Sequence, residues 1–161
     1  MINCDELIMQ TQVEKHAVEP IVEAKNRYSM IVFSGTVDKL MSVGILASGA
    51  VALGMDVDIF ATFWGLNALK KGAPETNIQF SKEVEELAGP MMELMQKKNM
   101  PSWYSMLKEA KELGKVKIHA CSTMFGLMDL KKEDLDPIVD DIIGVGTFLE
   151  LARDSEITLF I

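Results

Sequence analysis

Hydrophobic and polar positions along the chain follow two periods in turn, and this alternation predicts strands separated by helices. Strands are expected where apolar, β-branched or alternating residues run for about four to eight positions. The stretches that fit are residues 28–33, 55–62, 116–120, 141–145 and 156–161. Because helical segments separate them, the strands should be parallel and joined by right-handed crossovers. The pattern therefore predicts an α/β fold, with residues 1–161 as a single domain around a five-stranded parallel sheet.

The most apolar segment, residues 40–55, is expected to be a buried helix. It is shorter than the roughly twenty residues that a membrane span needs, so no span is predicted. Its small residues, among them Gly44, Ala47 and Gly49, suit close packing onto the sheet. A turn over residues 34–38 is expected to lead from the first strand into this helix.

Two segments stand outside the regular alternation of strand and helix. Residues 1–27 have the spacing of an amphipathic helix and are expected to form an N-terminal helical arm. Residues 70–101 are rich in methionine and long for a crossover, which predicts a helical insertion. Helices are also expected over residues 102–113, with Ser102 as the N-cap, and over residues 131–139.

Composition and charge narrow the classes of partner. The net charge of −8 disfavours nucleic acid and anionic membranes, since both are polyanions. A hydrophobic fraction of 48% predicts apolar surface buried between subunits, and hence a homo-oligomer. The two cysteines, Cys4 and Cys121, form no CxxC pair, so no disulfide framework or metal site is expected. With acids in place of a basic leader at the start, a reducing cytoplasm is the expected location.

Cys121 is the candidate for chemistry, because it follows the predicted strand 116–120 directly. In open parallel sheets, ligands bind beyond the carboxyl ends of the strands, where the next helix presents free N–H groups. A thiolate, the reactive form of cysteine, is favoured there. Alternation along the strand puts His119 on the face of the sulfur, where an imidazole can assist deprotonation. Ser122 and Thr123 are small and would leave the sulfur approachable.

Both residues also have a plain structural interpretation. A cysteine at a strand end is often a small buried hydrophobe, and a nearby histidine is commonly satisfied by a backbone carbonyl. The surroundings of Cys121 distinguish the two hypotheses. An open cleft with N–H groups aimed at the sulfur would favour chemistry, and burial among apolar side chains would favour a structural role.

Two other strand ends are expected to line the same crevice. Gly35 and Thr36 form the turn after the first strand, which either cradles an anion or serves tight packing and helix capping. Trp64 and Asn67 follow the second strand, where the tryptophan is either a ligand platform or a packing anchor. Parallel strands bring these ends together at one edge of the sheet.

With these residues in view, the chain resembles the DsrE/DsrF-like family, in the branch of DsrE-like sulfurtransferases. Three segments between Met30 and Ile161 carry the resemblance: IVFSGTVDKLMSVGILASGAVALGMDVDIFATFWGLNALKK, KIHACSTMFGLMDLKKEDL and GVGTFLELARDSEITLFI. The resemblance implies a three-layer α/β/α sandwich, flavodoxin-like in appearance. It also implies a trimer or hexamer. Sulfur-handling members carry a persulfide on a cysteine at the end of the third strand, and Cys121 stands at that position.

Two functions from different classes follow. The first is a sulfur relay in which Cys121 takes sulfane sulfur from a donor protein and passes it to a thiol of an acceptor protein, without a cofactor. The second is a non-catalytic oligomeric binding or scaffold subunit whose crevice holds a small anion or nucleotide. A flavin protein of flavodoxin type is disfavoured, because only Ser34 and Thr36 supply hydroxyls after the first strand.

Overall fold

The computed structural model describes residues 26–161, so nearly all of the expected N-terminal arm lies outside the described residues. Five parallel strands form one sheet in the order β4-β3-β2-β1-β5. The strands are β1 (Arg27–Val32), β2 (Asp56–Ala61), β3 (Val116–Cys121), β4 (Asp141–Ile143) and β5 (Ile157–Phe160). Every predicted strand is present, and the predicted fold class is confirmed.

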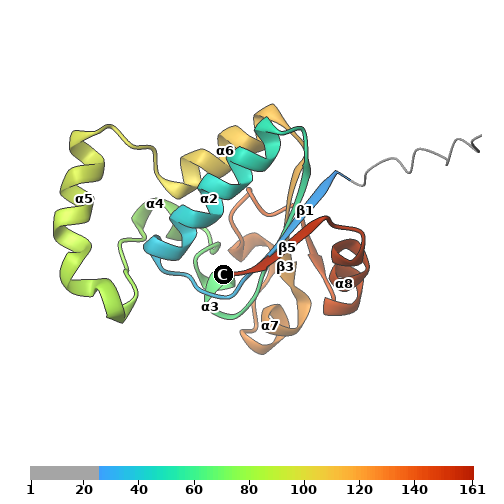
Figure 1. Ribbon diagram of the computed structural model, residues 1–161. Helices are drawn as coiled ribbons and strands as arrows, with labels where there is room; N and C mark the ends of the chain where they lie inside the picture. Colours follow the sequence, from blue (N-terminus) through green and yellow to red (C-terminus); the bar gives the residue numbers. More distant parts are fainter. Residues whose placement is uncertain (1–25) are drawn as a thin grey trace, which may run out of the picture.

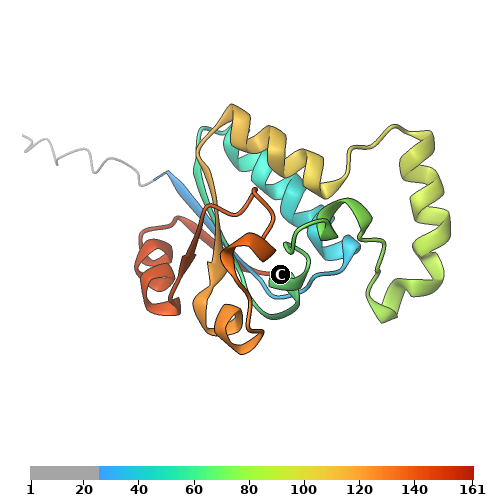
Figure 2. The same ribbon diagram turned by 180° about the vertical axis from the view of Figure 1, so that it is seen from behind.

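Helices cover both faces of the sheet (Figures 1 and 2). The long helix α2 (Val37–Ala52) and α6 (Trp103–Leu113) lie side by side on one face, and α8 (Val145–Arg153) lies on the other. One side of α2 is buried against the sheet and α6, but Ile45 and Leu46 are exposed, so the helix expected to be buried is buried on one side only. A Cβ added at Gly44 would lie 3.1 Å from Cβ of Met106, so this glycine permits the close approach of α6. Among residues 26–161, no helix has the length and apolar character to cross a membrane.

The second face is more sparsely covered. Phe148 of α8 is fully buried and stacks on Phe60 of β2, with ring centroids 4.7 Å apart. The short helices α3 (Phe63–Asn67) and α7 (Ser122–Leu127) follow β2 and β3 at the carboxyl edge of the sheet. The candidate residues that follow the first three strands therefore lie at this edge.

Residues 70–101 connect α3 to α6 and contain no strand of the sheet. They form α4 (Ala73–Thr76), the 3₁₀ helix η1 (Lys82–Leu87) and α5 (Ala88–Lys97). In Figure 1, α5 stands away from the sheet, beyond α2. The chain then enters α6, where the side chain of Ser102 accepts a hydrogen bond from the N–H of Ser105 (3.1 Å) as the expected N-cap.

The prediction of a helix over residues 131–139 is wrong. The structure has one 3₁₀ turn there, η2 (Lys132–Asp134), followed by an isolated bridge of Leu135 with Lys70 and a turn over residues 137–138. Pro137 lacks an N–H and disfavours helical geometry at the residue before it. The N–H of Asp136 instead donates to the carbonyl of Leu69 (2.9 Å), which ties this segment to the turn after α3.

Candidate functional site

Cys121 is the last residue of β3, and α7 begins at the next residue. Its side chain is buried, with 5% of the residue exposed. It belongs to an apolar cluster with Phe60, Leu66, Met124 and Phe148. The strand-end position predicted from the sequence is present, but the sulfur lies among apolar side chains and not in an open cleft. This environment is the one that the structural hypothesis expects.

His119 shares the face of Cys121 but directs both ring nitrogens elsewhere. The strand geometry continues through Cys121, which pairs with Ile143, so alternation keeps the two side chains on one face. Nε2 of His119 lies 3.0 Å from Oδ1 of Asp58, and Nδ1 is hydrogen bonded to Asp141. No ring nitrogen of His119 is left to bond the sulfur in this arrangement.

The charge state of His119 follows from these partners. Burial by itself lowers the pKa of the imidazole, but hydrogen bonds to Asp58 and Asp141 and their negative charge raise it, and the net result is a raised pKa. Nε of Arg27 lies 3.4 Å from Oδ2 of Asp58 and compensates part of the negative charge. The group is thus a hydrogen-bonded charge cluster that joins β1, β2, β3 and β4, in which His119 and Asp58 are buried and Asp141 is exposed.

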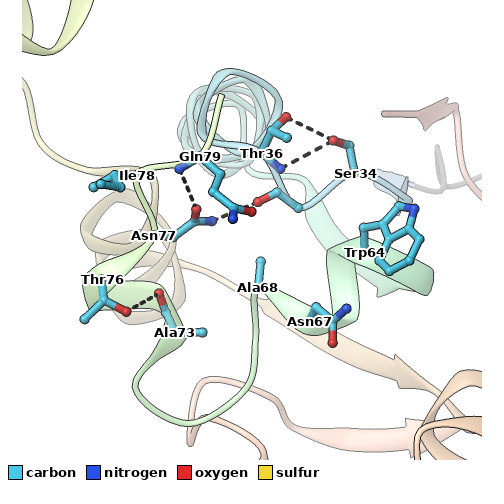
Figure 3. Close-up of a pocket in the computed structure, with 11 residues that line it drawn as sticks. Ser34, Thr36, Trp64, Asn67, Ala68, Ala73, Thr76, Asn77, Ile78 and Gln79 are labelled. Carbon is cyan, nitrogen blue, oxygen red and sulfur yellow. Dashed lines mark hydrogen bonds between the residues drawn. The ribbon is translucent and has the colours of Figure 1, made fainter. Parts of the chain in front are cut away.

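The four expected crevice residues at the first two strand ends come together in a cavity of about 490 Å³ (Figure 3). Gly35 and Thr36 form one side and Trp64 and Asn67 another. A further wall, residues 76–79, comes from the end of α4 and the segment after it. Cys121, Ser122 and Thr123 do not line this cavity, so the crevice expected from the sequence is divided. Ser122 and Thr123 are exposed on α7.

Two glycines hold the turn with Trp64 against the end of β1. A Cβ at Gly35 would lie 2.3 Å from the carbonyl oxygen of Trp64, and a Cβ at Gly65 would lie 2.3 Å from that of Val32. The N–H of Gly65 donates to the carbonyl of Phe33 (2.8 Å). Only residues without a Cβ allow the two backbones to approach so closely. Segments 34–36 and 63–67 therefore form one rigid corner of the cavity.

The sequence interpretation missed two groups of residues. Of the carboxylates of Asp58 and Asp141, only that of Asp58 is buried, and it carried a signal, because a charged residue inside an apolar strand is rarely buried without a partner. Asn77 and Gln79 of the cavity wall carried none, since residues 70–101 follow no regular period. In the described part of the chain, no group of three or more His, Cys, Asp or Glu side chains is placed to hold a metal ion.

Comparison with known proteins identifies the family of this chain. A model of the DsrE/DsrF/DrsH-like family matches residues 24–92 and 73–160 of this chain. The uncharacterized protein YrkE of Bacillus subtilis (strain 168) is 34% identical over 166 residues, which cover 88% of this chain and 100% of that protein. The sulfur carrier protein DsrE2 of Allochromatium vinosum is 29% identical over 159 residues, which cover 85% of this chain and 99% of that protein.

A solved structure shares the fold. MTH1491, a protein of unknown function from Methanobacterium thermoautotrophicum, superposes with a TM-score of 0.51 at 15% sequence identity. The match covers 83% of this chain and 97% of that one. At this identity the likeness concerns the fold alone.

Proposed function

The chain belongs to the DsrE/DsrF/DrsH-like family, and on that premise we propose that it is a sulfur carrier holding sulfane sulfur as a persulfide on Cys121. The observation that carries the proposal is the position of Cys121, the last residue of β3 directly before α7. A relative covering 85% of the chain is a sulfur carrier protein, which supports the same chemistry.

The proposed reaction moves one sulfur atom with no net oxidation. The Cys121 thiolate attacks the outer sulfur of a donor persulfide, forming a new S–S bond as the donor's S–S bond breaks and the donor leaves as a thiolate. An acceptor thiolate then attacks the outer sulfur on Cys121 and releases the Cys121 thiolate. The chain would act between a donor protein and an acceptor protein, as a sulfurtransferase that needs no cofactor.

The burial of Cys121 sets a condition on this reaction. With 5% of the residue exposed, the sulfur cannot meet a partner's thiol until the covering side chains move. Helix α7 has six residues and adjoins the cysteine directly, so its displacement would uncover the sulfur. We assign no direct proton transfer to His119, because such a step would require breaking a hydrogen bond to Asp58 or Asp141.

Mass mapping after anaerobic polysulfide treatment tests the proposal. In the full chain, one or more sulfur atoms should be found on Cys121 and should be lost on incubation with a thiol acceptor. Cys121→Ser and Cys121→Ala should abolish the addition, and Cys4→Ser is the matched control that should retain it. Sulfur found only on Cys4, or no adduct on Cys121 in a folded protein, would contradict the proposal.

The burial of Cys121 among apolar side chains favours a second candidate, a binding subunit without sulfur chemistry. In that case the thiol is a packing residue and the cavity of Figure 3 is the functional feature. The same mass-mapping experiment separates the two functions, since a binding subunit would leave Cys121 unmodified. Homo-oligomerisation is expected for either function.

A further inference from the structure

We propose that the cavity of about 490 Å³ at the ends of β1 and β2 binds an uncharged, planar heteroaromatic group of the nucleobase class. Its volume lies in the range of about 300–1,000 Å³ usual for small-molecule sites. The proposal deepens the binding-subunit function and is independent of sulfur transfer on Cys121.

The lining of the cavity is polar but uncharged. Its residues are hydroxyl-bearing, amide, apolar or glycine, and none of those assigned to it from residues 26–161 is acidic or basic. The side-chain amides of Asn67 and Gln79 have no hydrogen-bond partner within the described residues. Each amide offers both a donor and an acceptor, which matches the mixed donor and acceptor edges of nucleobases. The two amides therefore favour a neutral ligand with such an edge.

Trp64 supplies a flat surface on the same short helix as Asn67 and across the cavity from Gln79 (Figure 3). The residue is 59% exposed, although its backbone is held tightly. Gly35 and Gly65 fix the turn against β1, and Phe63 next to it has a φ of +46°, a strained conformation for a bulky residue. An aromatic side chain that is exposed and rigidly supported is suited to stack on a base.

The wall opposite Trp64 is preformed. Nδ2 of Asn77 donates to the carbonyl of Gly35 (2.8 Å), and the N–H of Gln79 donates to Oδ1 of Asn77 (3.1 Å). The carbonyl of Gln79 accepts from the N–H of Val37 (2.6 Å) at the start of α2. These bonds connect the segment after α4 to the turn after β1, so the cavity does not depend on a ligand for its shape.

The same bonds disfavour a phosphate as the recognised group. The N–H of Val37 is occupied by Gln79, and the N–H of Thr36 contacts Oγ of Ser34 at 3.4 Å. The next residue, Asp38, adds a carboxylate at this helix terminus, held by the N–H and hydroxyl of Ser81 at 2.9 and 2.7 Å. This carboxylate in the first turn of α2, itself 3.7 Å from Nζ of Lys39, already compensates the positive helix terminus that an anion would use. The recognised part of the ligand should therefore be the base.

Tryptophan fluorescence tests the proposal, because Trp64 is exposed and the other tryptophan, Trp103, is buried at 2%. The full chain is titrated with adenosine, guanosine, cytidine and uridine, and in parallel with their 5′-monophosphates and a short oligoribonucleotide. We expect saturable quenching by at least one nucleoside, with weaker binding of its monophosphate and of the oligoribonucleotide.

Calorimetry with variants locates the site. Trp64→Leu, Asn67→Ala and Gln79→Ala should each weaken nucleoside binding by about tenfold or more. Gln96→Ala, an exposed amide on α5 outside the cavity, is the matched control and should bind as the wild type does. Circular dichroism checks that each variant is folded. Failure of every nucleoside to bind at millimolar concentration, tighter binding of the monophosphate or oligoribonucleotide, or unchanged binding in folded Asn67→Ala and Gln79→Ala variants would overturn the proposal.

The outcome is independent of the sulfur experiment. Loss of nucleoside binding in Trp64→Leu with sulfur loading of Cys121 intact would show that sulfur loading does not require nucleoside binding. Absence of sulfur loading together with saturable nucleoside binding would leave the cavity proposal standing and remove the sulfur carrier.

Discussion

Nε2 of His119 lies 3.0 Å from Oδ1 of Asp58, and both residues are buried between strands that are neighbours in the sheet. Removing the carboxylate leaves a buried imidazole with a charged partner on one side only. Asp58→Ala should lower the free energy of unfolding by about 3 kcal/mol. Asp56→Ala, at the exposed end of the same strand, is the control and should have a much smaller effect. Urea denaturation measures both, and equal effects would contradict the assignment.

The stability of the protein should also depend on pH through His119. Its pKa in the folded state is raised above the usual value of about 6.5, because Asp58 and Asp141 outweigh the effect of burial. The stabilisation is therefore fully present below about pH 6.5 and is lost as pH rises through the folded pKa. Denaturation at a series of pH values should show wild type losing stability relative to His119→Gln. The other histidine, His16, serves as control, and His16→Gln should follow the wild-type profile.

Gly35 and Gly65 should tolerate no side chain. Alanine at either position would place a Cβ 2.3 Å from a backbone carbonyl oxygen, and the backbone must shift to accept it. We expect Gly35→Ala and Gly65→Ala each to cost about 3 kcal/mol, at the upper end for overpacking. Gly49, on the exposed side of α2, has no atom within 4 Å of an added Cβ. Gly49→Ala should stabilise the protein by about 1 kcal/mol in thermal or urea unfolding.

Neither tyrosine of the chain should ionise near pH 10 while the protein is folded. Burial raises the pKa of Tyr28. Burial and a hydrogen bond of 2.9 Å to Asp136 raise the pKa of Tyr104 to about 12. Ultraviolet titration should show no phenolate step near pH 10 in native protein, and a step of two groups there in urea. A phenolate step near pH 10 in native protein that the Tyr104→Phe substitution removes would contradict the effect of the hydrogen bond to Asp136.

Alkylation should report how often Cys121 becomes accessible. In a Cys4→Ser background, iodoacetamide should modify Cys121 at least about tenfold more slowly in native protein than in urea, because the reagent needs the open state. Substitution of Met124, which covers the cysteine from α7, by alanine should speed the native reaction. Equal rates in native protein and in urea would show that the cysteine is not covered in solution.

The chain should form a homo-oligomer. The edge strand β5 exposes Ile157, Leu159 and Phe160 at 45%, 37% and 68%, and its outer side has no strand partner within residues 26–161. Exposed apolar edge strands are sites of association. Light scattering at high micromolar concentration should give a mass above 17.9 kDa. Leu159→Lys should lower it, and a wild-type mass of one chain would contradict the expectation.

The strands could be predicted from the sequence because each has a local pattern. Residues 55–62 alternate around the observed β2, and the apolar, β-branched residues over 116–120 located β3. The extent of β4 was overestimated, since it ends at Ile143 and Val145 already belongs to α8. The absence of a helix over residues 131–139 also follows from a local feature, because Pro137 disfavours helix and the prediction did not take it into account.

The candidate site was less predictable, because its contacts join residues far apart in the sequence. His119 and Asp58 are 61 residues apart, and only the order of strands in the sheet brings them together. The position of Cys121 was predicted correctly, but its burial depends on Phe60, Leu66 and Phe148 from other elements. The small residues after the cysteine gave the opposite expectation. Local patterns thus located the residues, and tertiary packing determined their surroundings.

The helix α3 contributes residues both to the cavity at the ends of β1 and β2 and to the apolar cluster around Cys121. Trp64 and Asn67 line the cavity, and Leu66 between them is fully buried in the cluster that covers Cys121. A helix of five residues cannot adjust one side and leave the other in place. A ligand that holds α3 would therefore oppose any opening of the cluster in which α3 moves together with α7, and by thermodynamic linkage such an opening would weaken the binding of that ligand by the same factor.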